Sequence, residues 1–154
     1  MIGRMGMPPE ERLGMDLKRV EQELMAAKHA AVKVAGLTVP QYAALFALAD
    51  SPGISAAALA RACLVTPQAM AGVLKNLEER GLVERTPHQW HRNVLETRLT
   101  EDGHAALEAA DERAVAIERR ISEEFTSEER DTLRSLLARC SKAIQAGDAD
   151  SVTE

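Results

Sequence analysis

The chain has 154 residues, of which 19 are Lys or Arg and 24 are Asp or Glu, so its formal net charge is −5. This length suits one domain with its own core, and an aromatic content of only 3% favours helices over a sheet-rich fold. The acidic balance excludes a protein that coats nucleic acid regardless of sequence, yet residues 55–99 carry six Lys or Arg against four Asp or Glu.

The first predicted helix covers residues 10–34 and follows a short N-terminal tail. Leu13, Leu17 and Val20 follow one another at steps of four and three, which is typical of a stripe that packs against another helix. Gly36 ends this helix. The stripe is therefore a candidate contact with a partner subunit.

A second helix is predicted to begin after Thr38, which is suited to capping it, and to end at residues 51–53. The core side of this helix is expected to include Tyr42 and Phe46. Ile54 is then expected to form a strand of one or two residues.

Two shorter helices follow, joined by a tight turn. Ser55 is an N-cap candidate for the first, and Thr66 with Pro67 gives the second a sharp start. Gly81 stands where a left-handed residue closes the second helix. The inward positions of this helix are apolar, whereas its outer face is small, polar and mildly basic, as the major groove of DNA requires of a recognition helix. An ordinary amphipathic helical hairpin is the alternative.

The segment 82–99 alternates as two strands around a polar tip, which predicts a β-hairpin directly after the recognition helix, in other words a wing. The tip carries His88, Trp90, His91 and Arg92, which can contact phosphates or enter a minor groove. The alternative for Trp90 is that it folds back on its own hairpin.

Two long helices complete the pattern. Thr100 caps the first, and Thr126 opens a capping box for the second. Their apolar stripes suggest, together with the first helix, a homodimer interface built from both ends of the chain, unless they pack within one subunit. The candidate interface residues are Leu13, Leu17, Val20, Leu107, Ile117, Ile121, Leu133 and Leu137.

The order of elements and three motifs resemble the MarR family of bacterial transcription regulators. The motifs are Leu64-Val65-Thr66-Pro67, Leu77-Glu78-Glu79-Arg80-Gly81-Leu82-Val83-Glu84-Arg85 and Leu99-Thr100-Glu101-Asp102-Gly103. The resemblance spans about residues 10–144. It implies a homodimeric winged helix-turn-helix protein that binds a pseudo-palindromic double-stranded DNA operator and is often released from it by a small phenolic or anionic ligand.

Two positions depart from that family. The wing tip reads His91-Arg92-Asn93 where an Asp commonly precedes the arginine, so the wing geometry and any pH dependence differ from the usual pattern. Gly72 stands where many members carry a larger residue. The residues that the interpretation brings to DNA are Ser55, Thr66, Gln68, Ala69, Gly72, Lys75, Arg85, His88, Trp90, His91, Arg92 and Asn93.

The predicted fold is mainly α with a small β-wing: two helices, a short strand, two helices, two strands and two long helices. Residues 1–154 are expected to form one domain, with dimerisation helices at 10–35 and 101–146 and the DNA-binding region at 38–99. The groove between the first two helices, the start of the long fifth helix and the winged domain is a candidate effector site. His29, Tyr42 and Phe46 lie within its reach and suit a small aromatic acid, although both aromatic residues can instead be core.

No catalytic motif or cofactor-binding loop is found, so an enzyme is not predicted. The sequence has no membrane-length apolar run and no signal-peptide pattern, which predicts a soluble cytoplasmic protein. The alternatives are a winged helix used only for protein contacts and a redox or metal-responsive regulator. The last of these would rely on Cys63 and Cys140, which lack metal-ligand spacing, or on His88 and His91, which are too few for a good metal site.

Overall fold

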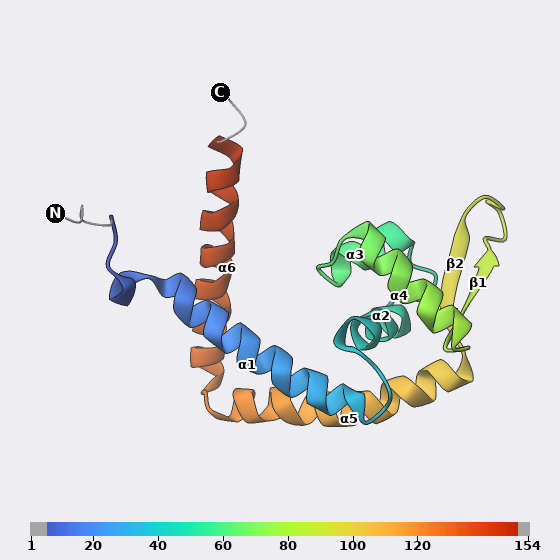
Figure 1. Ribbon diagram of the computed structural model, residues 1–154, viewed down its shortest axis with the longest axis horizontal. Coiled ribbons are helices and arrows are strands. Elements are labelled where there is room, and N and C mark those ends of the chain that lie inside the picture. The colour runs from blue at the N-terminus through green and yellow to red at the C-terminus, as the bar shows by residue number, and fades with distance from the viewer. Residues whose placement is uncertain (1–5, 151–154) are drawn as a thin grey trace. The chain divides into compact units, whose positions relative to one another are not determined.

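The computed structural model describes residues 6–150, and Figure 1 shows the path of the chain through them. Helices dominate this part of the chain, and two strands form an antiparallel hairpin. The elements are a 3-10 turn (Pro9–Glu11), α1 (Leu13–Lys33), α2 (Val39–Asp50), α3 (Ala56–Ala62), α4 (Pro67–Glu79), β1 (Val83–Pro87), β2 (Leu95–Leu99), α5 (Glu101–Glu123) and α6 (Ser127–Asp150).

The described residues form two compact units, and the division between them falls inside α5. The first unit ends at Val115 and contains α1 to α4, the hairpin and the first part of α5. The second unit begins at Ala116 and contains the rest of α5 and α6. The helix-turn-helix, the wing and the candidate effector groove all belong to the first unit.

Side-chain caps start α2 to α6 at the positions that the sequence predicts, whereas α1 has no side-chain cap. Each capping hydroxyl accepts a hydrogen bond from the backbone N–H three residues later, at 3.0 to 3.3 Å, which satisfies a donor that the helix itself leaves unpaired. Two of these caps, at α2 and α6, are reciprocal capping boxes. The capping residues are Thr38, Ser55, Thr66, Thr100 and Thr126.

The strand expected at Ile54 does not form. Gly53 adopts a φ of +80°, and the Ile54 N–H turns back to donate to the Ser51 carbonyl at 3.2 Å. The Gly53 N–H donates to the Thr97 carbonyl of β2, also at 3.2 Å. The Ile54 N–H is therefore used within the turn, and the sheet of the described residues has two strands where three were expected.

The core of the first unit is aliphatic, and α2 contributes to it through the face that carries Ala44, Leu45 and Leu48. The expectation that Phe46 belongs to the core is wrong, because its side chain is 53% exposed on the adjacent face of α2. The buried core comprises Val32, Leu37, Ala44, Leu45, Leu48, Leu59, Ala60, Met70, Leu74, Leu77, Leu82, Val83, Leu107 and Ala110.

The first turn of α5 lies directly against the chain that leaves α4. The Thr100 N–H donates to the Leu82 carbonyl at 3.1 Å, and the Thr100 hydroxyl donates to the Gly81 carbonyl at 2.6 Å. A β-carbon at Gly103 would overlap the Leu82 carbonyl oxygen and lie only 3.0 Å from its carbon. Glycine at position 103 therefore allows the two segments to touch through their main chains.

Candidate nucleic-acid interface

Helices α3 and α4 form the predicted helix-turn-helix, with their axes bent by 107°. The Val65 N–H donates to the Ala60 carbonyl and the Leu64 N–H to the Arg61 carbonyl, at 3.1 and 3.2 Å. Leu64 therefore occupies the left-handed position of a Schellman ending, with a φ of +56°, and its side chain is 93% exposed. The sequence analysis did not anticipate this strained leucine.

Helix α4 has the two faces that the sequence predicts. Met70, Leu74 and Leu77 are buried. The opposite face is exposed and includes Gln68 and Lys75. The helix ends as predicted: Gly81 has a φ of +70°, and the Gly81 and Leu82 N–H groups close a Schellman motif on the carbonyls of Glu78 and Leu77. Of the remaining predicted DNA contacts in this region, Ser55, Thr66, Ala69 and Gly72 are also exposed.

A polar network centred on the buried Gln41, which the sequence analysis missed, ties α4 to α2. The Gln41 amide nitrogen donates to Asn76 Oδ1 at 2.7 Å, and an Arg80 guanidinium nitrogen donates to Gln41 Oε1 at 3.3 Å. The same Gln41 oxygen also accepts from the Thr38 N–H at 2.9 Å. Because Gln41 is buried, these bonds fix how α4 lies on the core.

The wing is a hairpin in which Val83 pairs with Leu99 and Pro87 with Leu95. Trp90 at its tip is 81% exposed, so it does not fold back on the hairpin. The tip residues that were predicted to contact DNA differ in exposure: His91, Arg92 and Asn93 are exposed and His88 is half-buried.

Arg85 is half-buried on β1. Among the described residues its Nε is a buried donor without a hydrogen-bond partner. The position of Arg85 on the wing, two residues after Val83, keeps it close to the interface that the sequence predicts.

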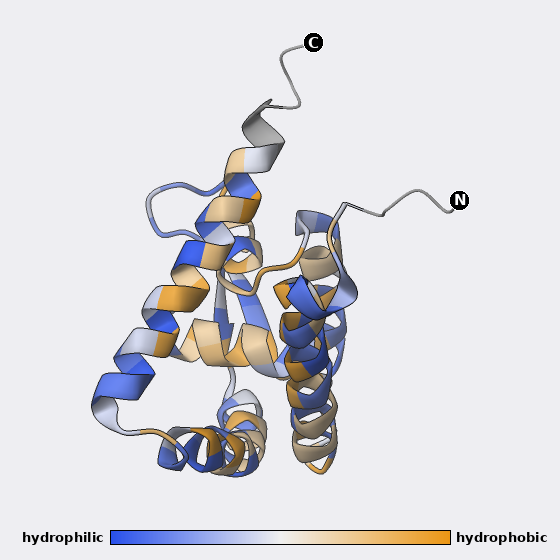
Figure 2. Cartoon of the chain, turned by 90° about the vertical axis from the view of Figure 1, so that its left-hand side faces the viewer, coloured by the Kyte–Doolittle hydropathy of each residue, from blue (hydrophilic) through white to orange (hydrophobic). Residues whose placement is uncertain are grey.

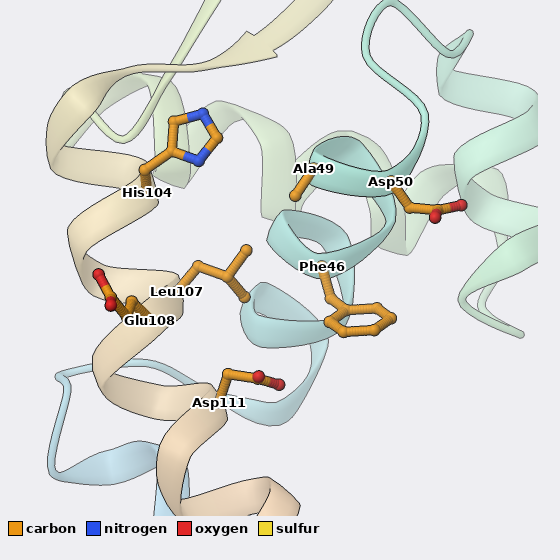
Figure 3. Close-up of a pocket in the computed structure, with 7 residues that line it drawn as sticks. All are labelled: Phe46, Ala49, Asp50, His104, Leu107, Glu108 and Asp111. Carbon is orange, nitrogen blue, oxygen red and sulfur yellow. The ribbon is translucent and has the colours of Figure 1, made fainter.

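A groove of about 440 Å³ lies between α2 and the first part of α5 (Figure 3). It combines an aromatic and aliphatic wall with polar groups, as small-molecule sites do. Figure 3 shows the Leu107 side chain pointing from α5 toward α2, which carries Phe46. Its lining residues are Phe46, Ala49, Asp50, His104, Leu107, Glu108 and Asp111.

The three residues predicted for the effector site do not all meet at this groove. Phe46 lines it, and Tyr42 lies behind the lining, with ring centroids 6.1 Å apart. The Tyr42 hydroxyl donates to Asp111 Oδ1 at 2.7 Å, which fixes that lining carboxylate. His29 is exposed on α1 and does not line the groove, whereas His104, which the sequence analysis did not select, does.

The predicted dimer stripes are exposed in part. Leu13 is 69% exposed, and Leu17 and Val20 are also exposed on α1. In the second unit, Ile121, Leu133 and Leu137 are exposed and line a groove. Figure 2 shows apolar residues along the helix that leads to the C-terminus.

Two residues of the predicted dimer set are placed differently. Leu107 and Ile117 are each only 8% exposed, because their own chain already covers them, and Leu107 belongs to the core. They have little surface left to offer a partner subunit.

Among residues 6–150, no three His, Cys, Asp or Glu side chains converge as metal ligands. Cys63 and Cys140 are both free and half-buried, and burial raises the pKa of the Cys63 thiol. No single helix in this range has the length and apolarity to cross a membrane, although the bent pair α3 and α4 meets that test by length and composition alone.

A model of the MarR family matches residues 35–92, which include α2, the helix-turn-helix and most of the wing. The chain is 35% identical to the HTH-type transcriptional repressor Rv2887 of Mycobacterium tuberculosis over 133 residues, which cover 86% of this chain and 96% of the relative. It is also 38% identical to the transcriptional regulator HosA of Escherichia coli O127:H6 over 58% of this chain and 63% of HosA.

Solved structures of MarR-family regulators also resemble this chain. The Rv2887 complex with salicylic acid matches with a TM-score of 0.64 and 35% identity, covering 84% of this chain and 96% of that one. The repressor CouR bound to a 23-mer DNA duplex matches with a TM-score of 0.75 and 29% identity, covering 86% and 94%. The chain therefore belongs to the MarR family and is a winged helix-turn-helix transcription regulator.

Proposed function

We propose that this protein is a cytoplasmic repressor that binds a pseudo-palindromic operator as a homodimer and leaves it when a small aromatic acid binds. The observation that carries the DNA-binding part is the exposed outer face of α4, held by its caps and by Gln41, with an exposed wing tip beside it in the chain. Such a helix enters a major groove, and a wing reaches the adjacent backbone or minor groove. The DNA-bound relative CouR supports the same assignment.

Gln68 and Lys75 carry different parts of this binding. A Gln amide can make a bidentate contact with adenine, so Gln68→Ala should lower the affinity for the operator much more than the affinity for random DNA. Lys75 pairs with a phosphate or a guanine, so Lys75→Ala should weaken binding and, for a phosphate contact, lower the salt slope by about one. Both residues are exposed, so neither change should disturb folding.

The test is fluorescence anisotropy with DNA from the region flanking the protein's own gene, across a range of salt concentrations, against a shuffled duplex. Lys33→Ala is the matched control, because Lys33 is an exposed lysine at the end of α1, outside the proposed interface. Equal affinity of the parent for operator and shuffled DNA would refute sequence-specific binding and favour a protein-interaction module.

The homodimer is proposed from the exposed stripes on α1 and in the second unit. Large apolar side chains in a continuous row favour burial against a partner. Deletion of residues 126–154 removes α6 and should yield aggregate or unfolded chain, measured by light scattering and circular dichroism. A well-folded monomer after this deletion would contradict the arrangement. A two-fold dimer would present its two α4 helices about 34 Å apart, one turn of DNA.

The effector is proposed to bind in the groove between α2 and α5, with its ring against Phe46. The salicylic acid complex of Rv2887 supports an aromatic acid. The ligand releases DNA only if its affinity differs between the DNA-bound and the released protein. Operator affinity is therefore titrated with salicylate for the parent and for Phe46→Ala. An unchanged response in Phe46→Ala would place the effector elsewhere.

A further inference from the structure

The imidazole of His88 contributes two of the four hydrogen bonds that close the tip of the wing. His88 Nδ1 accepts hydrogen bonds from the backbone N–H groups of Trp90 and His91, at 3.1 and 3.2 Å. The main chain adds two bonds, from the His88 N–H to the Val94 carbonyl at 2.7 Å and from the Val94 N–H to the His91 carbonyl at 2.8 Å. The tip is therefore a small folded loop rather than a free connection.

This geometry specifies which tautomer of the neutral His88 ring fits the tip. A nitrogen that accepts two N–H bonds carries no proton, so the neutral ring has its hydrogen on Nε2. His88 Nε2 lies 3.4 Å from Glu96 Oε1 on the opposite strand. The ring therefore spans the hairpin, accepting from the tip on one side and facing a carboxylate on the other.

We propose that His88 is a positioning residue for the wing: its neutral ring closes the tip, and protonation of Nδ1 opens it. A proton on Nδ1 would point at two N–H donors and replace two attractive contacts with repulsion. The imidazolium would keep its attraction to Glu96, so residues 90–93 would have to move away from the ring. Histidine gains this proton within the range of about pH 5 to 8 in ordinary surroundings.

The charged and titratable groups around His88 are few among the described residues. Glu96 faces its Nε2, and Arg98 lies 3.1 Å from the other oxygen of that carboxylate, at Oε2. The His91 ring has its centroid 5.4 Å from that of His88. The carboxylate of Glu96 and the imidazole of His91 are therefore the two groups that contact the His88 ring directly.

The consequence for DNA rests on the proposed function. The segment that His88 holds contains the exposed Trp90 and Arg92, the two tip side chains best suited to a minor groove. Opening the tip removes the fixed position of these side chains. Acidification adds positive charge and strengthens random phosphate contacts, so the expected loss is in the ratio of operator to random affinity.

The variants His88→Asn and His88→Ala distinguish the role of His88 as a hydrogen-bond acceptor from the effect of its protonation. An Asn carbonyl can accept the same two N–H bonds and does not titrate, so His88→Asn should hold the tip closed at every pH. His88→Ala lacks the acceptor and should leave the tip open at every pH. For the readout without DNA, His91→Asn is the matched control, since it removes the neighbouring imidazole and keeps His88.

The first readout needs no DNA. Trp90 is the only tryptophan of the chain, so the fluorescence of the free protein reports on the wing tip. Between about pH 8 and about pH 5, we expect a shift in the parent and in His91→Asn and none in His88→Asn. Far-UV circular dichroism on the same samples checks that the fold persists. A shift that survives in His88→Asn, or no shift in the parent, would overturn the proposal.

The second readout is the affinity ratio of operator to shuffled DNA. It should fall on acidification in the parent, stay level in His88→Asn and be low throughout in His88→Ala. A fluorescence switch that follows His88, in a protein that binds no operator, would leave the wing-tip proposal standing and refute the proposed function instead. A level ratio in a parent that does bind its operator would refute the link between them.

Discussion

Two glycine-to-alanine substitutions should have opposite effects on stability. In both cases a helical glycine becomes alanine, which by propensity alone stabilises a helix by about 1 kcal/mol. Gly72 has open space around its α-carbon on the outer face of α4. Gly72→Ala should therefore raise the free energy of unfolding by about 1 kcal/mol.

Gly103→Ala should instead lower the free energy of unfolding. The new β-carbon would overlap the Leu82 carbonyl oxygen, a main-chain atom that also accepts from the Thr100 N–H. Overpacking of this kind costs about 3 kcal/mol, because the backbone has to move. After the gain in propensity, about 2 kcal/mol of destabilisation remains.

Thermal unfolding at one fixed protein concentration measures both effects. For a chain of about 150 residues, 1 kcal/mol corresponds to about 2–4 °C in Tm. The Tm of Gly72→Ala should therefore be higher than that of the parent by about this amount, and the Tm of Gly103→Ala lower by about twice as much. If Gly103→Ala is as stable as the parent, the close contact of α5 with Leu82 is wrong. Gly72→Ala should also bind operator less well, since the added methyl group faces the proposed DNA surface.

Three further changes test other parts of the structure. Leu64→Gly should raise the free energy of unfolding by about 1 kcal/mol relative to Leu64→Ala, since glycine carries no penalty at a φ of +56°; equal stability in urea unfolding would exclude strain at Leu64. Asp111→Asn keeps an oxygen that accepts from Tyr42 but removes the negative charge of the groove carboxylate. Relief of about 1 kcal/mol of repulsion with the salicylate carboxylate should make salicylate bind about fivefold more tightly. Calorimetry should show no change for neutral salicylamide. Burial raises the pKa of Cys63 in the folded protein, so the stability that the neutral thiol contributes is present below its unfolded pKa and is lost as the pH rises through the folded pKa. In urea unfolding at alkaline pH, Cys63→Ala should therefore lose less free energy of unfolding than the parent. An equal loss in both proteins would exclude Cys63 as the cause.

The helix boundaries and the turn chemistry could be predicted because their signals are local. The Thr66 hydroxyl caps the start of α4 through an N–H only three residues away. The N–H groups of Gly81 and the following residue end the same helix by donating to carbonyls of its last turn. The same holds for Thr126 and Glu129 at α6. The strand predicted at Ile54 does not form for a related local reason: its N–H donates within the turn to the Ser51 carbonyl and not to a neighbouring strand.

Most of the residues that line the groove, and the polar network around Gln41, could not be predicted, because they join residues far apart in the chain. Tyr42 meets Asp111 across 69 positions, and Gln41 meets Asn76 across 35. No local pattern marks such partners. Heptad spacing likewise cannot tell whether a stripe is covered by its own chain, which is why Leu107 was assigned to a dimer interface but lies in the core.

The placement of α2 has a consequence for how members of such a family diversify. One face of α2 holds α4 through Gln41, and its other face offers Phe46 and Asp50 to the groove. The side chains proposed to read DNA and those lining the groove share no residue, so substitutions can retune operator choice and inducer choice separately. Gln41 and Asn76 belong to neither set, yet a change in either would alter how both are presented, so drift should be slowest at these two positions.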